Sequence, residues 1–146
     1  AFLDIYDDGQ RIWVLREYYY SGKDKMRQKT DSEYADDLIA FGGEEVIFNI
    51  LDPSALSFKT ELKKRGLRVK EADNEVLDGI RMTSTLFATK KLLIHERCEK
   101  LIAELQGYIW DEKAQQRGIE QPVKVNDHAC DALRYFCKTV VHPRRL

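Results

Sequence analysis

Long apolar runs are missing from this sequence: none approaches the roughly 20 residues that a membrane-spanning helix needs. The N-terminus also lacks the basic and then apolar layout of a secretory signal peptide. The 3 cysteines are Cys98, Cys130 and Cys137, an odd number at spacings that argue against a disulfide framework. We therefore expect a cytosolic protein with free thiols and no membrane segment.

A strong charge of one sign is absent too, since the formal net charge is −1. Any surface that binds nucleic acid must then be local. The patterns GxxxxGK[ST] and GxGxxG do not occur, so no motif for nucleotide binding is present. What the chain does have is 43% hydrophobic residues over 146 positions, enough for one domain with a buried core.

The N-terminal region predicts a hairpin and then a helix. Residues 1–20 contain two β-rich runs around Asp8-Gly9, a dipeptide favoured in tight turns because it tolerates positive φ. Thr30 and Glu33 have the spacing of a capping box, which predicts a helix that begins there.

The rest of the chain predicts alternating strands and helices. Residues 45–52, EVIFNILD, are almost continuously apolar, as is typical of a strand buried on both faces in a parallel sheet. The further predicted elements are a helix over 55–65, a strand over 67–72, a helix capped by Asn74, a strand over 91–96, a helix over 97–108, a strand over 108–113 and a last helix capped by Asn126 or Asp127. This order predicts an α/β fold, a three-layer sandwich on a mixed sheet.

Asp52 is the best-placed acid in the chain. It ends the strand that looks most buried and directly precedes Pro53, and ligands gather at the carboxyl ends of strands in open α/β sheets. The alternative is that Asp52 only caps the next helix, because Asp before Pro is a common helix entry. Both interpretations remain open on this residue alone.

The last predicted helix begins with ionisable side chains. His128 and Asp131 are three residues apart and share a face, which Tyr135 continues. Asp131 could be stabilised by the helix dipole alone, but a carboxylate near the buried edge is costly without a partner, and a metal ion would be one. The opposite face is apolar and is predicted to pack on the sheet: Ala129, Leu133, Phe136 and Val140.

Zinc-ligand residue types also occur, at His95, Cys98, His128 and Cys130. Successive helix residues are rotated by about 100°, so Cys130 points away from His128. Zinc is therefore disfavoured, and Cys130 and Cys137 are predicted to be small core residues.

Two groups of basic residues are candidates for contacting phosphates. Lys23, Lys25, Arg27 and Lys29 occupy every second position, so an extended segment would project all four to one side, as an arm suited to phosphates. The second group lies on the helix after Asp52 and the strand after that: Lys59, Lys63, Lys64, Arg65, Arg68 and Lys70. The alternative for either group is an ordinary solvated surface.

Five segments, in order, resemble the C-terminal nuclease domain of a tailed-bacteriophage terminase large subunit of the SPP1-like type: RQKTDSEYADDL, LDPSA, ADNEVLDGI, YIWDEKA and NDHACDALRY. The resemblance implies an RNase H-like fold and an endonuclease that cuts concatemeric viral DNA during genome packaging. By the same resemblance, Asp52 and Asp131 are two of three acids that bind divalent metal, and His128 is their neighbour in the active site.

The resemblance also implies that the first metal-binding acid lies in a strand upstream of Ala1, in a DYG-like motif. Residues 1–146 are then expected to be a single nuclease domain, a fragment without that first strand and without the N-terminal ATPase motor. Asp4, Asp7 and Asp8 belong to the hairpin, and none is assigned the missing role. The implied partners are double-stranded DNA, the terminase small subunit and the portal protein, in the host cytoplasm and outside the virion.

The function we expect is two-metal phosphodiester hydrolysis with Mg²⁺ or Mn²⁺, the ions that hard carboxylate oxygens suit. Two ions about 3.5–4 Å apart would flank the scissile phosphate in the complete site. Asp52 would bridge them, Asp131 would hold one, and His128 would orient water or protonate the leaving group. The alternatives are a nuclease of the same fold that resolves Holliday junctions, and a docking module that holds DNA or the portal without cutting.

Overall fold

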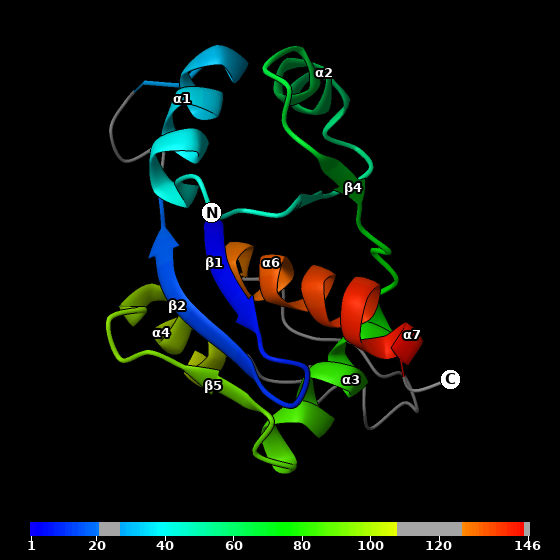
Figure 1. Ribbon diagram of the computed structural model, residues 1–146. Helices are drawn as coiled ribbons and strands as arrows, with labels where there is room; N and C mark the ends of the chain where they lie inside the picture. The colour runs from blue at the N-terminus through cyan, green and yellow to red at the C-terminus, as the bar shows by residue number, and fades with distance from the viewer. Residues whose placement is uncertain (21–26, 108–126, 145–146) are drawn as a thin grey trace, which may run out of the picture.

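The computed structural model describes residues 1–20, 27–107 and 127–144. The elements in these ranges are β1 (Phe2–Asp7), β2 (Ile12–Tyr18), α1 (Asp31–Gly42), β3 (Asn49–Leu51), α2 (Leu56–Lys64), β4 (Val69–Glu71), α3 (Val76–Ala88), β5 (Leu92–Ile94), α4 (Glu99–Gly107), α6 (His128–Phe136), a π-helical turn η1 (Cys137–Val141) and α7 (His142–Arg144). Figure 1 shows α1 and α2 at one end of the molecule, α3 and α4 at the other, and β1 and α6 between them. The strand predicted over 108–113 lies outside the described residues.

β1 and β2 form the predicted antiparallel hairpin. Gly9 in its turn has a φ of 88°, which glycine adopts without steric cost. The Asp8 carboxylate accepts hydrogen bonds from the backbone N–H groups of Gln10 (2.8 Å) and Arg11 (2.6 Å). The prediction of a turn at Asp8-Gly9 is confirmed.

The strands belong to two sheets. β5 pairs in parallel with β2, so β1, β2 and β5 form a three-stranded mixed sheet. β3 and β4 pair in parallel with each other as a separate two-stranded sheet. The predicted α/β class with a mixed sheet is confirmed, but hydrogen bonds between described strands do not join β3 to that sheet.

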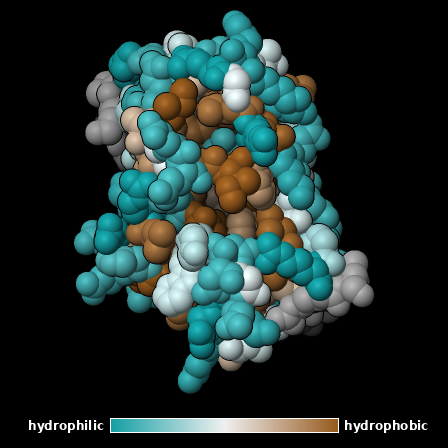
Figure 2. All heavy atoms as spheres, viewed as in Figure 1, coloured by the Kyte–Doolittle hydropathy of each residue, from teal (hydrophilic) through white to brown (hydrophobic). Residues whose placement is uncertain are grey.

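The prediction of one strand over residues 45–52, buried on both faces, is wrong. Only Asn49–Leu51 is a strand; its residues are half-buried, and Ile47 is 72% exposed. Because β4 is the only described strand that pairs with β3, no wider sheet covers this apolar run. Figure 2 shows apolar residues that run from the upper part of the viewed face, where α1, α2 and the connection between them lie in Figure 1, down to its centre.

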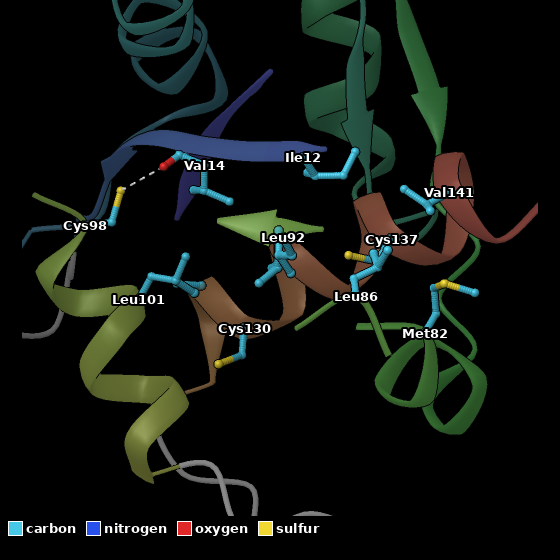
Figure 3. Packing of buried hydrophobic residues seen from close by; sticks show 12 residues of the cluster. Ile12, Val14, Met82, Leu86, Leu92, Cys98, Leu101, Cys130, Cys137 and Val141 are labelled. Carbon is cyan, nitrogen blue, oxygen red and sulfur yellow. Dashed lines mark hydrogen bonds between the residues drawn. The ribbon is translucent and has the colours of Figure 1, made fainter. Parts of the chain in front are cut away.

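The core lies between the mixed sheet and helices α3, α4 and α6 (Figure 3). Val14 from β2, Leu101 from α4 and Leu133 from α6 are at most 1% exposed, and burying a side chain of this size stabilises the fold by about 1.5–3 kcal/mol. The cysteines are all buried and free; burial was predicted for Cys130 and Cys137. In Figure 3 the Cys98 thiol points at the Val14 carbonyl, to which it donates at 3.9 Å.

Two helix starts test the capping predictions. At α1, Thr30 Oγ1 accepts from the Glu33 N–H at 3.2 Å and the Glu33 carboxylate accepts from the Thr30 N–H at 3.3 Å, so the capping box is confirmed. At α3 the cap is Glu75 rather than the predicted Asn74, because the Glu75 carboxylate accepts from the Asp78 N–H at 3.1 Å. The Asn74 side chain instead contributes to lowering the pKa of Asp52, after Tyr135 and Ser54.

The last helix changes its period at η1. A π-turn bonds residue i to i+5 and so has more residues per turn than an α-helix. Across this turn the step from buried Cys137 to buried Val141 is four residues, and it continues the line of Ala129 and Leu133 on α6. Phe136 and Val140, predicted to lie on the apolar face, are only partly buried. In the described part of the chain, no helix combines the length and apolar character needed to cross a bilayer.

Candidate active site

Asp52 follows β3 directly, and its side chain turns back on the local backbone. One carboxylate oxygen, Oδ1, accepts from the Ser54 N–H at 2.9 Å and from the Ser54 hydroxyl at 3.0 Å. The N-cap of α2 is Ala55, which makes no side-chain cap. The alternative that Asp52 caps this helix is therefore wrong, and its second oxygen is directed elsewhere.

That second oxygen faces α6. The Tyr135 hydroxyl donates to Asp52 Oδ2 at 2.6 Å, across 83 residues of sequence. The bond to Tyr135, followed by the bonds from Ser54, lowers the pKa of Asp52 below its ordinary value of 3.8. Asp52 is therefore ionised at neutral pH and held against the last helix.

Asp131 lies one helical turn before Tyr135 and is half-buried. Burial raises the pKa of Asp131, and the nearby negative charge of Asp127 raises it further. The Arg134 guanidinium opposes this rise, since its Nη2 lies 3.3 Å from Asp131 Oδ1. Ionised Asp131 is thus only partly compensated by the protein itself.

Tyr135 links the two acids. Its pKa is raised first by burial, then by the hydrogen bond to Asp52, and then by the charges of Asp52 and Asp131. Both carboxylates therefore act on one phenol, although they come from β3 and α6, which are far apart in the chain. Within the described residues, no group of three or more His, Cys, Asp or Glu side chains is arranged to hold a metal ion. Asp52 and Asp131 are the two acids whose charges act on Tyr135.

His128 lies at the exposed start of α6. Its ring meets the Tyr19 ring edge-on, with centroids 6.4 Å apart. His128 and Asp131 are three residues apart on α6 and share a face, so the two side chains are neighbours. Its role as a proton donor or acceptor stays a prediction.

A family model described as a terminase RNAseH like domain matches residues 3–139. The chain belongs to this family. The large terminase subunit of Escherichia phage T5 is 30% identical over 132 residues, which are 88% of this chain and 29% of that protein. The large terminase of a thermophilic bacteriophage superposes with a TM-score of 0.85 and 42% identity over 91% of this chain and 34% of that one. The complex of that terminase with ADP gives a TM-score of 0.84 and 38% identity over 96% of this chain and 39% of that one.

The chain spans about a third of the length of the relatives it matches. The RNase H-like fold and the resemblance to a terminase nuclease domain are confirmed over nearly all of the chain. At identities of 37–42%, the likeness to the structures of the thermophilic phage enzyme includes sequence as well as architecture.

Two buried polar residues of this terminase domain were not predicted from the sequence. Glu104 on α4 accepts hydrogen bonds from the Ala129 (2.9 Å) and Cys130 (3.0 Å) N–H groups, so it serves the start of α6 that Asp127 leaves without a side-chain cap. Arg134 donates to the carbonyls of Asn74 (2.9 Å) and Glu75 (3.3 Å). Only the three-residue spacing of Asp131 and Arg134 was visible in the sequence.

The predicted basic arm of the terminase domain is described only in part, because Lys23 and Lys25 lie outside the described residues. Arg27 pairs with Glu33 at 2.5 Å, and Lys29 pairs with Asp37. Two of the four cations are therefore bound to acids of α1 rather than projecting freely. Their role in DNA binding stays a prediction.

The second basic group also contains residues that are paired with acids, and it contains others that are not. Lys59 pairs with Glu71, and Arg65 pairs with Asp36 at 2.6 Å. Lys63, Lys64 and Arg68 are exposed and make no ion pair with any described residue. Their charge is available to an anionic partner.

The zinc-type residues have other uses. Burial raises the pKa of the Cys130 thiol to about 12, so it stays protonated in the core at neutral pH. The His95 Nδ1 atom accepts from the Arg97 N–H at 3.0 Å. Cys130 and Cys137 are core residues, as predicted.

Proposed function

We propose that this chain is a divalent-metal-dependent endodeoxyribonuclease domain that cuts concatemeric viral DNA during genome packaging. Membership of the terminase RNase H-like family supports nuclease chemistry. The observation that carries the proposal is the bond from Tyr135 to Asp52, because it brings a strand-end carboxylate to the helix that bears Asp131. Double-stranded DNA is the proposed substrate, and the small subunit and portal protein are the proposed partners, in the host cytoplasm.

The two carboxylates fit a hard divalent cation such as Mg²⁺ or Mn²⁺. Asp52 is ionised, and Asp131 carries a charge that burial and Asp127 disfavour, so a cation would offset it. When bound, divalent ions neutralise charge on the phosphate and make water a better nucleophile. Asp52 and Asp131 would hold one ion, and a second is expected in a site completed by a third acid.

The other residues of the site would orient the Asp52 carboxylate and transfer protons. Tyr135 fixes the rotation of the Asp52 carboxylate through its hydroxyl. His128 is exposed beside Asp131 and is a candidate to orient the attacking water or to protonate the leaving oxygen. Exposed Lys63, Lys64 and Arg68 are candidates to contact phosphates of the duplex, and Lys23, Lys25, Arg27 and Lys29 remain so.

Plasmid nicking tests the proposal. We expect a chain extended upstream through the strand that the resemblance implies to nick supercoiled DNA in Mn²⁺ or Mg²⁺ and not in a chelator. Asp52→Asn and Asp131→Asn should each abolish nicking, while Glu44→Gln, an exposed acid away from the site, should not. Absence of metal-dependent nicking would favour a docking module. A strong preference for four-way junctions over linear DNA would favour a junction resolvase.

A further inference from the structure

The hydrogen-bonded sheets do not determine where Asp52 lies relative to Asp131. Asp52 follows β3, which is joined only to β4 among the described strands, whereas α6 packs on β1 of the other sheet as well as against β3. A short two-stranded unit held this way can shift relative to α6 unless side chains hold it. The separation of the two acids therefore depends on contacts between the β3–β4 unit and the last helix.

Two consecutive residues of α6 supply those contacts at the acids themselves. Tyr135 donates to Asp52 Oδ2 at 2.6 Å. Arg134 points one guanidinium nitrogen at Asp131 (3.3 Å) and the other at the Asn74 carbonyl (2.9 Å). Each acid is thus tied to this pair of residues.

Further contacts lie next to Arg134 and Tyr135. One turn later, Lys138 pairs with Asp73 at 2.8 Å, and the Thr139 hydroxyl accepts from the Asp73 N–H at 2.9 Å. On α3, a Cβ at Gly79 would lie 2.6 Å from Cγ of Arg134, so only glycine leaves room for this side chain. The absence of a side chain at Gly79 therefore lets Arg134 reach the segment before α3.

We propose that Arg134 and Tyr135 are positioning residues that hold Asp52 and Asp131 in the relative orientation that binds one divalent cation. This inference rests on the proposed function, since it gives these residues a purpose at the same site. They act through the two acids and are not assigned contact with DNA. Partners that orient metal-binding carboxylates typically change metal affinity by about 10–100-fold when removed.

Binding of Mn²⁺ alone to the 146-residue chain tests Tyr135, measured from the electron paramagnetic resonance signal of free Mn²⁺. Tyr135→Phe should weaken binding about 10-fold with little change in melting temperature, since it removes one hydroxyl. Tyr6→Phe, at an exposed tyrosine of β1, is the matched control and should bind as the unaltered chain does. Unchanged or tighter binding by Tyr135→Phe overturns the positioning role.

A double-variant comparison separates positioning from a general structural effect. If Tyr135 acts through Asp52, then Tyr135→Phe should have no further effect on binding in an Asp52→Asn background. An equal loss in both backgrounds overturns the inference. Mn²⁺ binding that Asp52→Asn itself does not weaken overturns the proposed metal site, and the inference with it, so the two failures are distinguishable.

Gly79→Ala tests Arg134 without altering an acid or a hydrogen-bonding group. The added methyl group must displace the Arg134 stem, and we expect Mn²⁺ binding to weaken as it does in Arg134→Lys. Gly107→Ala, where a Cβ meets nothing within 4 Å among the described atoms, is the matched control. If Gly79→Ala melts cooperatively and binds Mn²⁺ normally, the role of Arg134 is overturned. If Gly79→Ala does not fold, the binding of Arg134→Lys decides in its place.

Discussion

Among the described carboxylates whose pKa is clearly shifted, Asp131 is the one whose pKa is raised. Its carboxylate is half-buried, Asp127 adds repulsion, and Arg134 at 3.3 Å is its partner on the same helix. Because burial is the largest cause, the pKa of Asp131 is raised and its ionised form is less stable in the folded chain than in the unfolded one. Such a group is retained against a cost in stability, which is typical of functional sites.

Asp131→Asn should therefore abolish cutting while leaving the melting temperature equal or higher near neutral pH. The carboxyl group's contribution to the free energy of unfolding is present below its ordinary pKa of 3.8 and is lost as pH rises through the raised value. Asparagine does not ionise, so the difference in melting temperature between the variant and the unaltered chain should shrink as the pH is lowered toward 3.8. Melting curves across this range check the sign. A variant that unfolds outright would indicate a structural role for Asp131.

At the scale of elements, the start of α6 depends on another helix. The first N–H groups of a helix need acceptors, and here the Glu104 carboxylate of α4 accepts two of them inside the core. The start of α4 is served in the same way, since Glu17 of β2 accepts from the Lys100 and Leu101 N–H groups at 2.9 Å. The sheet thus orients α4, and α4 orients the helix that bears Asp131.

Glu104→Ala should lower the free energy of unfolding by about 2 kcal/mol or more, because leaving a buried donor without an acceptor costs about 1–3 kcal/mol. Glu104→Gln keeps an acceptor oxygen and should cost less. Urea unfolding measures both, with exposed Glu45→Ala as the control. Equal losses for alanine and glutamine would show that the hydrogen bonds to α6 are not the cause.

The segment before α1 allows a prediction about DNA binding. If the arm contacts phosphates, replacing Lys23, Lys25, Arg27 and Lys29 with alanine should weaken binding and flatten the slope of log affinity against log salt by about 0.9 per lost contact. Because Arg27 and Lys29 are already paired with Glu33 and Asp37, the Lys23/Lys25 pair should account for most of the change. Binding isotherms at several salt concentrations compare the variant that replaces Lys23 and Lys25 with the variant that replaces Arg27 and Lys29. A slope that none of them alters would remove the arm from the DNA path.

At the scale of the whole molecule, the number of acids limits the metal chemistry. Asp52 and Asp131 are two side chains, and two dications held close together need more carboxylate oxygens than these supply. We expect the 146-residue chain to bind at most one Mn²⁺ weakly and to cut poorly, and a chain extended upstream through the implied strand to bind two ions and cut. Calorimetric titration and plasmid nicking, run in parallel on both, check this. If the 146-residue chain cuts normally, the third metal-binding acid must lie within it, and Asp4 is the first candidate to test.

Local features of the fold were predictable because their causes are local. The Asp8-Gly9 turn, the Thr30 capping box and the helix after Asp52 depend on residues a few positions apart, and the structure confirms each. The family, and with it Asp52 and Asp131 as the candidate acids, was also within reach of the sequence, because short motifs keep their order along the chain.

Only the tertiary structure decided how these parts meet. Periodicity along a chain cannot show which strands pair, so the separation of β3 from the mixed sheet was not foreseen, nor was the exposure of Ile47. The same limit hid the bond from Tyr135 to Asp52 and the capping of α6 by Glu104, because each joins residues far apart in sequence. The sequence by itself indicated which residues are the candidate acids, Asp52 and Asp131. The fold decided that a tyrosine and an arginine of the last helix hold the two acids, since long-range hydrogen bonds form only once the chain has packed.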